Sequence, residues 1–211
     1  MRVGDDSEEI RRNDGPDMDA WEAWTPAEAA ERLTGAGAVW WVVAGWAVDL
    51  FLGEETREHE DLEIAIHRAD FEKLRRHLDS MEFFAAGSGE IRALANAGEW
   101  ADEQHQRWVL EPDVQKWRMD VMLQPGDAET WVFRRDESIT APRVEMIGAT
   151  PDGIPFELPH GVLLYKAKAA RPKDEADFAA CLPRLEDPSR EWLADALAQA
   201  HPGHPWIDRL R

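Results

Sequence analysis

The sequence predicts an α/β (α+β) chain in which a mixed-sheet N-terminal domain precedes a small helical C-terminal domain. Two strand patterns support the first part, a continuous apolar run over 39–43 and an apolar-polar alternation over 61–67, each beside a helix-like segment. The last third of the chain carries helix-like segments only. Residues 158–211 hold eight acidic and eight basic residues, so residues 1–157 carry the whole net charge of −19. We therefore expect domains over 19–157 and 158–211.

Length, charge and cysteine content exclude several classes of function. The chain has 211 residues, enough for a sizeable core, with 43 acidic and 24 basic residues. Nucleic acid and membrane surfaces are disfavoured as partners, because binding to their phosphates needs Lys and Arg. The longest apolar stretch, 36–44, is too short to span a bilayer. The single cysteine, Cys181, excludes an internal disulfide, and we expect a cytoplasmic protein with Cys181 in the core.

The first expected elements are an arm and a capped helix. Acidic, basic and glycine residues dominate 1–18, which predicts a disordered arm. Thr25 and Glu28 form a capping-box pattern around Pro26, which indicates a helix to about Leu33.

A strand, a tight turn and a short helix are expected next. The run over 39–43 suits a buried strand, and Gly45 then marks a sharp turn. A helix over 46–52 follows and ends at Gly53.

The next strand carries two carboxylates. Between Asp61 and His67 the apolar side chains face one side, whereas Asp61 and Glu63 face the other, which predicts a half-buried strand. Asp70 is expected to cap a helix that runs to about Leu78.

The remaining segments predict a strand meander and then helices. Glu-Pro-Asp and Pro-Gly-Asp turns separate the three strands that we expect over 107–111, 117–123 and 130–134. Helices are expected over 161–170, 173–182 and 189–200.

Three carboxylates are candidates for metal-assisted phosphoryl chemistry. Asp61 and Glu63 lie on one strand face with their Cα atoms about 6.6 Å apart, so their side chains can converge on shared cations. Asp120 stands in a largely apolar strand, where an unpaired acid is costly to bury. The alternatives are a solvated polar face for the pair and a salt bridge from Asp120 to Arg118.

The ordered motifs resemble the polymerase-β-like nucleotidyltransferases, and most closely the branch of aminoglycoside 2''-adenylyltransferases and lincosamide nucleotidyltransferases. The resemblance spans about Trp40 to Trp206, and it rests on segments 44–53, 56–64, 163–168, 173–178 and 204–206. It implies a nucleotidyltransferase mixed-sheet domain and a site in which Asp61, Glu63 and Asp120 bind two Mg²⁺ ions. In this implied site, Asp120 also takes the proton of the acceptor hydroxyl.

ATP is the co-substrate that the resemblance implies, and its phosphates need donors and cations. Backbone N–H groups of Ala44, Gly45 and Trp46 at a helix start form an anion site, although Ala44 replaces the first glycine of the family pattern. Lysines cluster with Arg171 in one eight-residue stretch. The candidate cations are Arg57, Lys166, Lys168 and Lys173. The alternative is an intrahelical pair between Lys173 and Asp177, with the other cations solvated.

One histidine and several tryptophans also have expected roles. His59 is expected to orient Asp61 or Glu63 by a hydrogen bond, or to cap a turn, rather than to act in catalysis. We expect the tryptophans at 40, 41, 117 and 131 in the core, whereas Trp100 and Trp108 are candidates to stack a sugar or a base.

The sequence thus predicts a Mg²⁺-dependent nucleotidyltransferase that moves AMP from ATP to a hydroxyl of a small acceptor. An aminoglycoside-type antibiotic is the first acceptor candidate, because an acidic domain attracts polycations. One alternative is a nucleotidyltransferase-like antitoxin that binds or modifies a protein partner, and another is a catalytically silent nucleotide binder. We expect a monomer or a weak homodimer.

Overall fold

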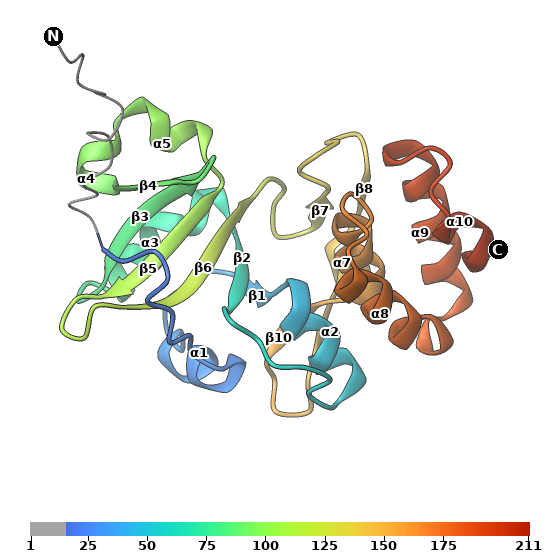
Figure 1. Cartoon of the computed structure of the whole chain (residues 1–211), viewed down its shortest axis with the longest axis horizontal. Coiled ribbons are helices and arrows are strands. Elements are labelled where there is room, and N and C mark those ends of the chain that lie inside the picture. The colour runs from blue at the N-terminus through green and yellow to red at the C-terminus, as the bar shows by residue number, and fades with distance from the viewer. Residues whose placement is uncertain (1–15) are drawn as a thin grey trace, which may run out of the picture.

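A mixed eight-stranded sheet forms the frame of the computed structural model, which describes residues 16–211 (Figure 1). The strands are β1 (Trp40–Val42), β2 (Glu63–His67), β3 (Glu82–Gly87), β4 (Glu90–Ala93), β5 (Gln106–Glu111), β6 (Lys116–Gln124), β7 (Thr130–Val132), β8 (Thr140–Pro142), β9 (Ile147–Ala149) and β10 (Pro155–Glu157). The large sheet has the order β4-β3-β5-β6-β2-β1-β10-β9, and β7 and β8 form a separate two-stranded sheet. Strand β2 is parallel to β6, and β1 is parallel to β10.

Helices pack at the side and at one end of this sheet (Figure 1). They are α1 (Pro26–Arg32), α2 (Ala44–Leu52), α3 (Phe71–His77), α4 (Leu94–Ala97), α5 (Glu99–Glu103), α6 (Arg143–Met146), α7 (Pro159–Lys166), α8 (Pro172–Cys181), α9 (Asp187–Ala200) and α10 (Trp206–Leu210). Helices α7 to α10 form the helical part expected from the sequence, while the domain boundary itself stays a prediction. No helix within residues 16–211 is long and apolar enough to cross a membrane.

The predicted three-strand meander is wrong in its last strand. Strands β5 and β6 pair antiparallel in the large sheet as expected, but β7 leaves that sheet and pairs with β8. Gly126, with φ of +96°, turns the chain away after β6. The β7–β8 hairpin packs instead against α7 and α9, where Trp131 meets Tyr165 and Trp192 edge to face. A turn signal in the sequence predicts a change of direction, but not which partner the next strand finds.

The strand that carries Glu63 is buried on both faces. Ile64 and Ile66 are fully buried in the main core, as the alternation predicts. Ala65 is also fully buried, in a second cluster with Trp41, and His67 is 5% exposed. The prediction of a half-buried strand was therefore wrong beyond its first residue, because segments far away in the chain cover the face that the sequence marks as polar.

The capping box of α1 is confirmed, whereas Asp70 does not cap α3 with its side chain. Thr25 and Glu28 exchange the two hydrogen bonds of the box. The Asp70 carboxylate instead accepts the Val39 N–H at 3.2 Å and the Lys73 ammonium at 2.6 Å. It thereby ties the entrance of β1 to the start of α3.

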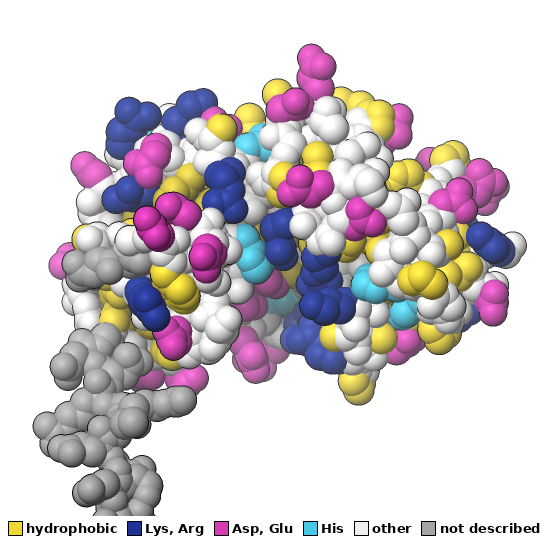
Figure 2. Space-filling model, turned by 90° about the horizontal axis from the view of Figure 1, so that it is seen from above, with side chains coloured by type: hydrophobic (Ala, Val, Ile, Leu, Met, Phe, Trp, Pro, Cys, Tyr) yellow, Lys and Arg dark blue, Asp and Glu magenta, His cyan; other side chains and the backbone are white. Residues whose placement is uncertain are grey.

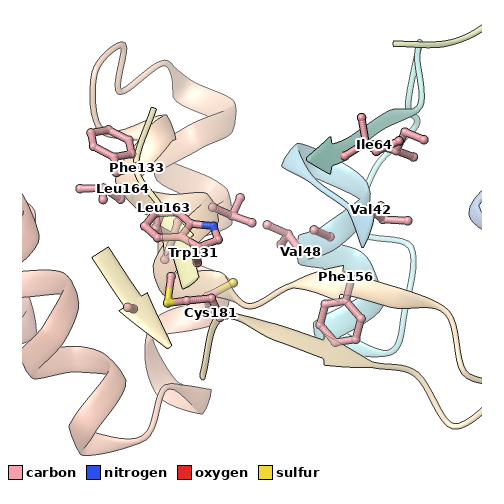
Figure 3. Close-up of a cluster of buried hydrophobic side chains, with 14 of the residues drawn as sticks. Val42, Val48, Ile64, Trp131, Phe133, Phe156, Leu163, Leu164 and Cys181 are labelled. Carbon is pink, nitrogen blue, oxygen red and sulfur yellow. The ribbon is translucent and has the colours of Figure 1, made fainter. Parts of the chain in front are cut away.

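One continuous core joins the sheet to the helical part (Figure 3). Val42 and Ile64 from the sheet and Val48 from α2 lie on one side of it, and Leu163, Trp131 and Cys181 lie on the other. Cys181 is fully buried, as expected. This packing fixes α7 and α8 relative to the sheet, and so fixes the space between them.

The described structure begins inside the segment that we expected to be an arm. Residues 1–15 of the predicted arm lie outside the described residues. The last part of the arm is tied to the sheet, because the indole N–H of Trp117 donates to the Asp17 carbonyl at 2.7 Å.

Candidate active site

Glu63 and Asp120 lie side by side on two parallel strands. They are direct register partners in the pairing of β2 with β6, and the Asp120 N–H donates to the Leu62 carbonyl at 2.8 Å. Neighbouring strands are about 4.8 Å apart, so these carboxylates project from the same sheet face as neighbours. Asp61 lies two residues before Glu63 and lines the same pocket. The fold thus brings together the three carboxylates that the sequence singles out.

Burial and mutual repulsion raise the pKa values of two of these carboxyl groups. Burial, followed by the charges of Asp61 and Asp120, raises the pKa of Glu63 to about 8. Burial is also the main cause that raises the pKa of Asp120 to about 7, with a smaller contribution from Asp61. Clustered like charges in a buried place are typical of functional sites, because a bound cation or a reacting proton offsets the repulsion.

The salt bridge from Arg118 to Asp120, the alternative to a metal-binding role for Asp120, is not formed. The Arg118 guanidinium pairs with Glu111 at 2.6 Å and with Glu22 at 2.9 Å. One oxygen of Asp120 accepts the Gln106 amide at 2.7 Å, while Oδ1 is buried and has no hydrogen-bond partner among the described residues. Asp120 therefore keeps an acceptor oxygen that is free for a ligand.

The carboxylates fit a divalent cation that prefers oxygen ligands. Oδ1 of Asp120 has no hydrogen-bond partner within the described structure, and burial and the neighbouring carboxylates raise the pKa of Glu63. A bound cation would satisfy the first group and offset the repulsion at the second. Within residues 16–211, no three Asp, Glu, His or Cys side chains already stand in a shared ion-binding arrangement. Binding of an ion thus requires these side chains to rotate. The pairing of β2 with β6 keeps the Cα atoms of Glu63 and Asp120 next to each other while they do so.

The tight turn before α2 lies beside Glu63. The Val43 N–H donates to the Glu63 carbonyl at 3.0 Å, which places the start of α2 next to the carboxylates. Ala44 has φ of +57°, a conformation that favours glycine. The turn therefore adopts a glycine-like geometry despite the alanine.

Gly45 leaves room for two side chains that pack on the turn. A Cβ at this position would collide with the Arg57 guanidinium and lie 2.9 Å from the His59 ring. Glycine at this place thus allows Arg57 to approach the N-terminus of α2 closely.

His59 does not orient Asp61 or Glu63. Its Nε2 lies 2.6 Å from the buried Asp49 carboxylate on α2, and its ring stacks on Trp46 with centroids 4.3 Å apart. The same carboxylate accepts the Thr56 hydroxyl at 2.6 Å. These contacts fasten the loop over 56–61 to α2, so His59 holds the loop in place.

A pocket of about 670 Å³ opens between the sheet face and the start of the helical part. Predicted residues that line it are Ala44, Gly45, Trp46, Arg57, Asp61, Glu63, Lys166, Lys168 and Lys173. Asp120 is 3% exposed and does not line the pocket itself, but its register partner Glu63 and its hydrogen-bond partner Gln106 do. Figure 2 shows Lys and Arg side chains gathered in the middle of one face, between the two halves of the molecule.

The predicted lysines divide into a buried one and two exposed ones. Lys166 pairs with Asp177 at 2.8 Å and with Asp174 at 3.3 Å, and these two carboxylates are almost completely buried. Lys166 was expected to bind the phosphates of the nucleotide, but Asp174 and Asp177 already balance its charge. Lys168 and Lys173 are exposed at the pocket. The intrahelical pair between Lys173 and Asp177 does not form, since Asp177 faces Lys166 and lies 4.0 Å from Arg57.

Several pocket residues carry no clear signal in the sequence. His105, Gln106, Arg134 and Arg135 line the pocket near the end of β6, where the His105 carbonyl accepts the Leu123 N–H at 2.7 Å. Tyr165 lies between them, where its hydroxyl donates to Gln124 at 3.2 Å and accepts the Arg134 N–H at 3.1 Å. The one sequence feature that could have indicated them is the pair of adjacent arginines at the end of the strand expected over 130–134.

The tryptophans proposed to stack a sugar or a base do not reach the pocket. Trp108 packs edge to face on Trp21 and Trp117, and Trp100 stacks on the Arg92 guanidinium. Trp46 is the tryptophan that lines the pocket within residues 16–211.

Comparisons with known proteins agree with the fold and with the glycine turn. Residues 27–93 match the family described as aminoglycoside-2''-adenylyltransferase. The solution structure of the antibiotic-resistance factor ANT(2'')-Ia has 12% identity and a TM-score of 0.51, and covers 87% of this chain and 92% of that chain. This likeness shows the fold.

Two further solved structures have lower TM-scores. The crystal structure of ANT(2'')-Ia in complex with adenylyl-2''-tobramycin has 14% identity and a TM-score of 0.49, over 82% of this chain and 94% of that chain. An antigenic nucleotidyltransferase-like protein from Paracoccidioides brasiliensis has 13% identity and a TM-score of 0.45, over 87% and 88%. No curated protein matches the sequence.

The fold class and the resemblance predicted from the sequence are thus confirmed. The fold of the chain is thus similar to that of ANT(2'')-Ia, and its residues 27–93 match the family described as aminoglycoside-2''-adenylyltransferase.

Proposed function

We propose that the chain transfers AMP from ATP to a hydroxyl group of a small molecule, with Mg²⁺ as the required ion. The observation that carries this proposal is the register pairing of Glu63 with Asp120 beside a pocket lined with lysines and arginines. Asp61, Glu63 and Asp120 would hold the ions, which when bound stabilise the charge of the attacking and leaving oxygens.

The residues of this chain have separate tasks in the transfer. Asp120 takes the proton of the acceptor hydroxyl, whose oxygen forms a bond to the α-phosphorus while the bond to pyrophosphate breaks. The N-terminus of α2 at Gly45, together with Arg57, Lys168 and Lys173, binds the phosphates. The reaction needs no other co-reactant, because the proton goes to the carboxylate and the electron pair leaves with pyrophosphate.

Aminoglycosides are the first acceptors to test, because the matching family is described by them. Purified protein is incubated with Mg²⁺, ATP and an aminoglycoside panel, and pyrophosphate release and the mass of the acceptor are measured. We expect release of one pyrophosphate for each AMP attached. A folded sample that binds no nucleotide and turns over no acceptor with any nucleoside triphosphate would exclude the proposal.

A further inference from the structure

Positive side chains converge in the pocket beside Gln124, at the end of β6, in a protein of net charge −19. We call the pocket-lining residues His105, Arg134 and Arg135 the arginine end. Arg107 lies next to His105, because its guanidinium donates to the carbonyls of Gln104 and Gln106, and Arg68 donates to the nearby Asp102 carbonyl. The charges of all four arginines lower the pKa of His105. Burial contributes most to that change, and together these causes bring the His105 pKa to about 4.

The four arginines of this region lack acidic partners. The guanidinium of Arg107 donates to the carbonyls of Ala101, Gln104 and Gln106, at 2.7 to 3.1 Å. Arg135 donates to the Tyr165 carbonyl at 2.6 Å, and Arg68 donates to the Asp102 carbonyl at 3.4 Å. In the described part of the chain, no carboxylate lies within ion-pair distance of any of the four.

Two buried donors of these arginines have no partner among the described residues, Nε of Arg107 and Nε of Arg134. Burial and the charges of Arg135 and Arg68 lower the pKa of Arg134, although the group stays protonated at neutral pH. Repelling cations and unsatisfied donors are costly unless a ligand anion compensates them.

The nearby carboxyl of Glu157 does not supply that anion. It is 2% exposed, and burial raises its pKa to about 8, so near neutral pH it is mostly protonated. Its Oε1 accepts the Trp131 indole N–H at 2.8 Å rather than a guanidinium.

The arginine end lies on the acceptor side of the carboxylates. Strand β1 is antiparallel to β2, so the glycine turn lies beside Glu63, at the beginning of β2. Gln124, which contacts Tyr165 at the arginine end, lies four residues beyond Asp120 on β6, or about 13 Å along the strand. In an in-line transfer the acceptor oxygen attacks opposite to the leaving pyrophosphate. Phosphates bound at Gly45 therefore direct the acceptor towards Gln124.

We propose that the arginine end binds an oxyanion, a carboxylate or a phosphate, that the acceptor itself carries, which makes the acceptor an anionic hydroxyl compound rather than a polycation. The inference rests on the transferase function proposed above. The arginine guanidinium offers paired N–H donors that match the oxygens of both groups.

The test measures oxyanion binding while the nucleotide site is filled. Inorganic phosphate is titrated calorimetrically into the protein saturated with Mg²⁺ and a non-hydrolysable ATP analogue. We expect saturable binding at one site, weakened about tenfold or more in Arg135→Gln and in Arg134→Gln, because each variant loses a charged hydrogen bond. Arg75→Gln is the matched control, since Arg75 is exposed and pairs with Glu72 on α3, and it should bind phosphate like the parent protein.

Three results would overturn the inference. They are the absence of saturable phosphate binding beside the analogue, equal binding by the parent and by both variants, and equal weakening of phosphate and of the ATP analogue in the variants. The last result would assign the arginine end to the nucleotide. Far-UV circular dichroism checks that each variant is folded, and Arg135 is exposed, so its replacement leaves the core intact.

A kinetic arm separates this inference from the proposed function. With any acceptor that releases pyrophosphate, inorganic phosphate should inhibit competitively against the acceptor and not against ATP. Aminoglycoside turnover with a KM that neither phosphate nor Arg135→Gln changes would contradict the inference and leave the transferase in place. Absence of turnover with every acceptor, beside intact phosphate binding, would instead remove the proposed function.

Discussion

Glu63 and Asp120 face one another across two parallel strands, although 56 positions of sequence lie between them. The core face of both strands is apolar, and the opposite face carries the two carboxylates, of which Glu63 lines the pocket. Their raised pKa values follow from this arrangement, because burial and like charges act together on the same two groups. The site is therefore poised for a cation, at a cost in stability of the folded chain.

The first prediction concerns the proposed base. Asp120→Asn should lower kcat by about 10² to 10⁴-fold, because it removes a proton acceptor and an ionised ligand. Binding of ATP, measured by calorimetry, should persist, since the phosphate-binding residues are unchanged. Asp113→Asn in the exposed β5–β6 turn is the matched control and should keep full activity. Equal activity of Asp120→Asn and the parent would show that another group takes the proton.

The glycine turn gives a prediction on stability. Ala44 adopts φ of +57°, so Ala44→Gly should raise the free energy of unfolding by about 1 kcal/mol, as glycine adopts this conformation without a Cβ clash. Urea denaturation measures the change. Leu50→Gly, within the same helix at a negative φ, serves as the contrast and should destabilise the protein. A loss of stability in Ala44→Gly would mean that the turn relaxes in solution.

The two kinds of pocket lysine should respond differently to substitution. Lys166→Met leaves buried Asp177 without its close cation and Asp174 with Arg171 alone, and should lower the free energy of unfolding by about 3 kcal/mol. Lys173→Met removes an exposed charge and should leave stability within about 0.5 kcal/mol of the parent value. If Lys173 binds the triphosphate, its variant raises the KM for ATP with no change in the melting temperature. Thermal melts and ATP kinetics on both variants distinguish the two roles.

Buried Glu157 makes stability depend on pH. Its folded-state pKa of about 8 lies above the ordinary value of 4.5, so the unfolded chain releases this proton first as the pH rises. The contribution of Glu157 to stability is fully present below about pH 4.5, and it is lost as the pH rises towards about 8. Glu157→Gln keeps an oxygen that can accept the Trp131 N–H and removes this titration.

The measurement compares melting temperatures at about pH 5 and about pH 8.5. We expect Glu157→Gln to gain stability over the parent at the higher pH and to differ little from it at the lower one. Glu145→Gln on the exposed side of α6 should follow the parent at both values. A parent and a Glu157→Gln variant with the same pH profile would show that Glu157 is ionised in the folded protein.

Local chemistry determined much of what the sequence predicted about the fold. The capping box at Thr25, the end of α2 at Gly53 and the apolar side of β2 depend on residues close in the chain, and each was predicted. The outer two strands on each side of the large sheet, β3 with β4 and β9 with β10, were not predicted, and the partner of β7 was misassigned. Their pairing depends on distant segments, and strand patterns do not specify which partner is available.

The amino-acid sequence by itself determined the three carboxylates, the glycine turn and the family resemblance, because these are matters of residue type and order. Only the tertiary structure decided that Lys166 is neutralised by Asp174 and Asp177, that His59 holds Asp49, and that Arg134 and Arg135 meet His105 at one end of the pocket. The physical reason is that the state of a charged side chain depends on which other charges approach within a few ångströms. The packing of distant segments sets that distance, and residue spacing along the chain does not.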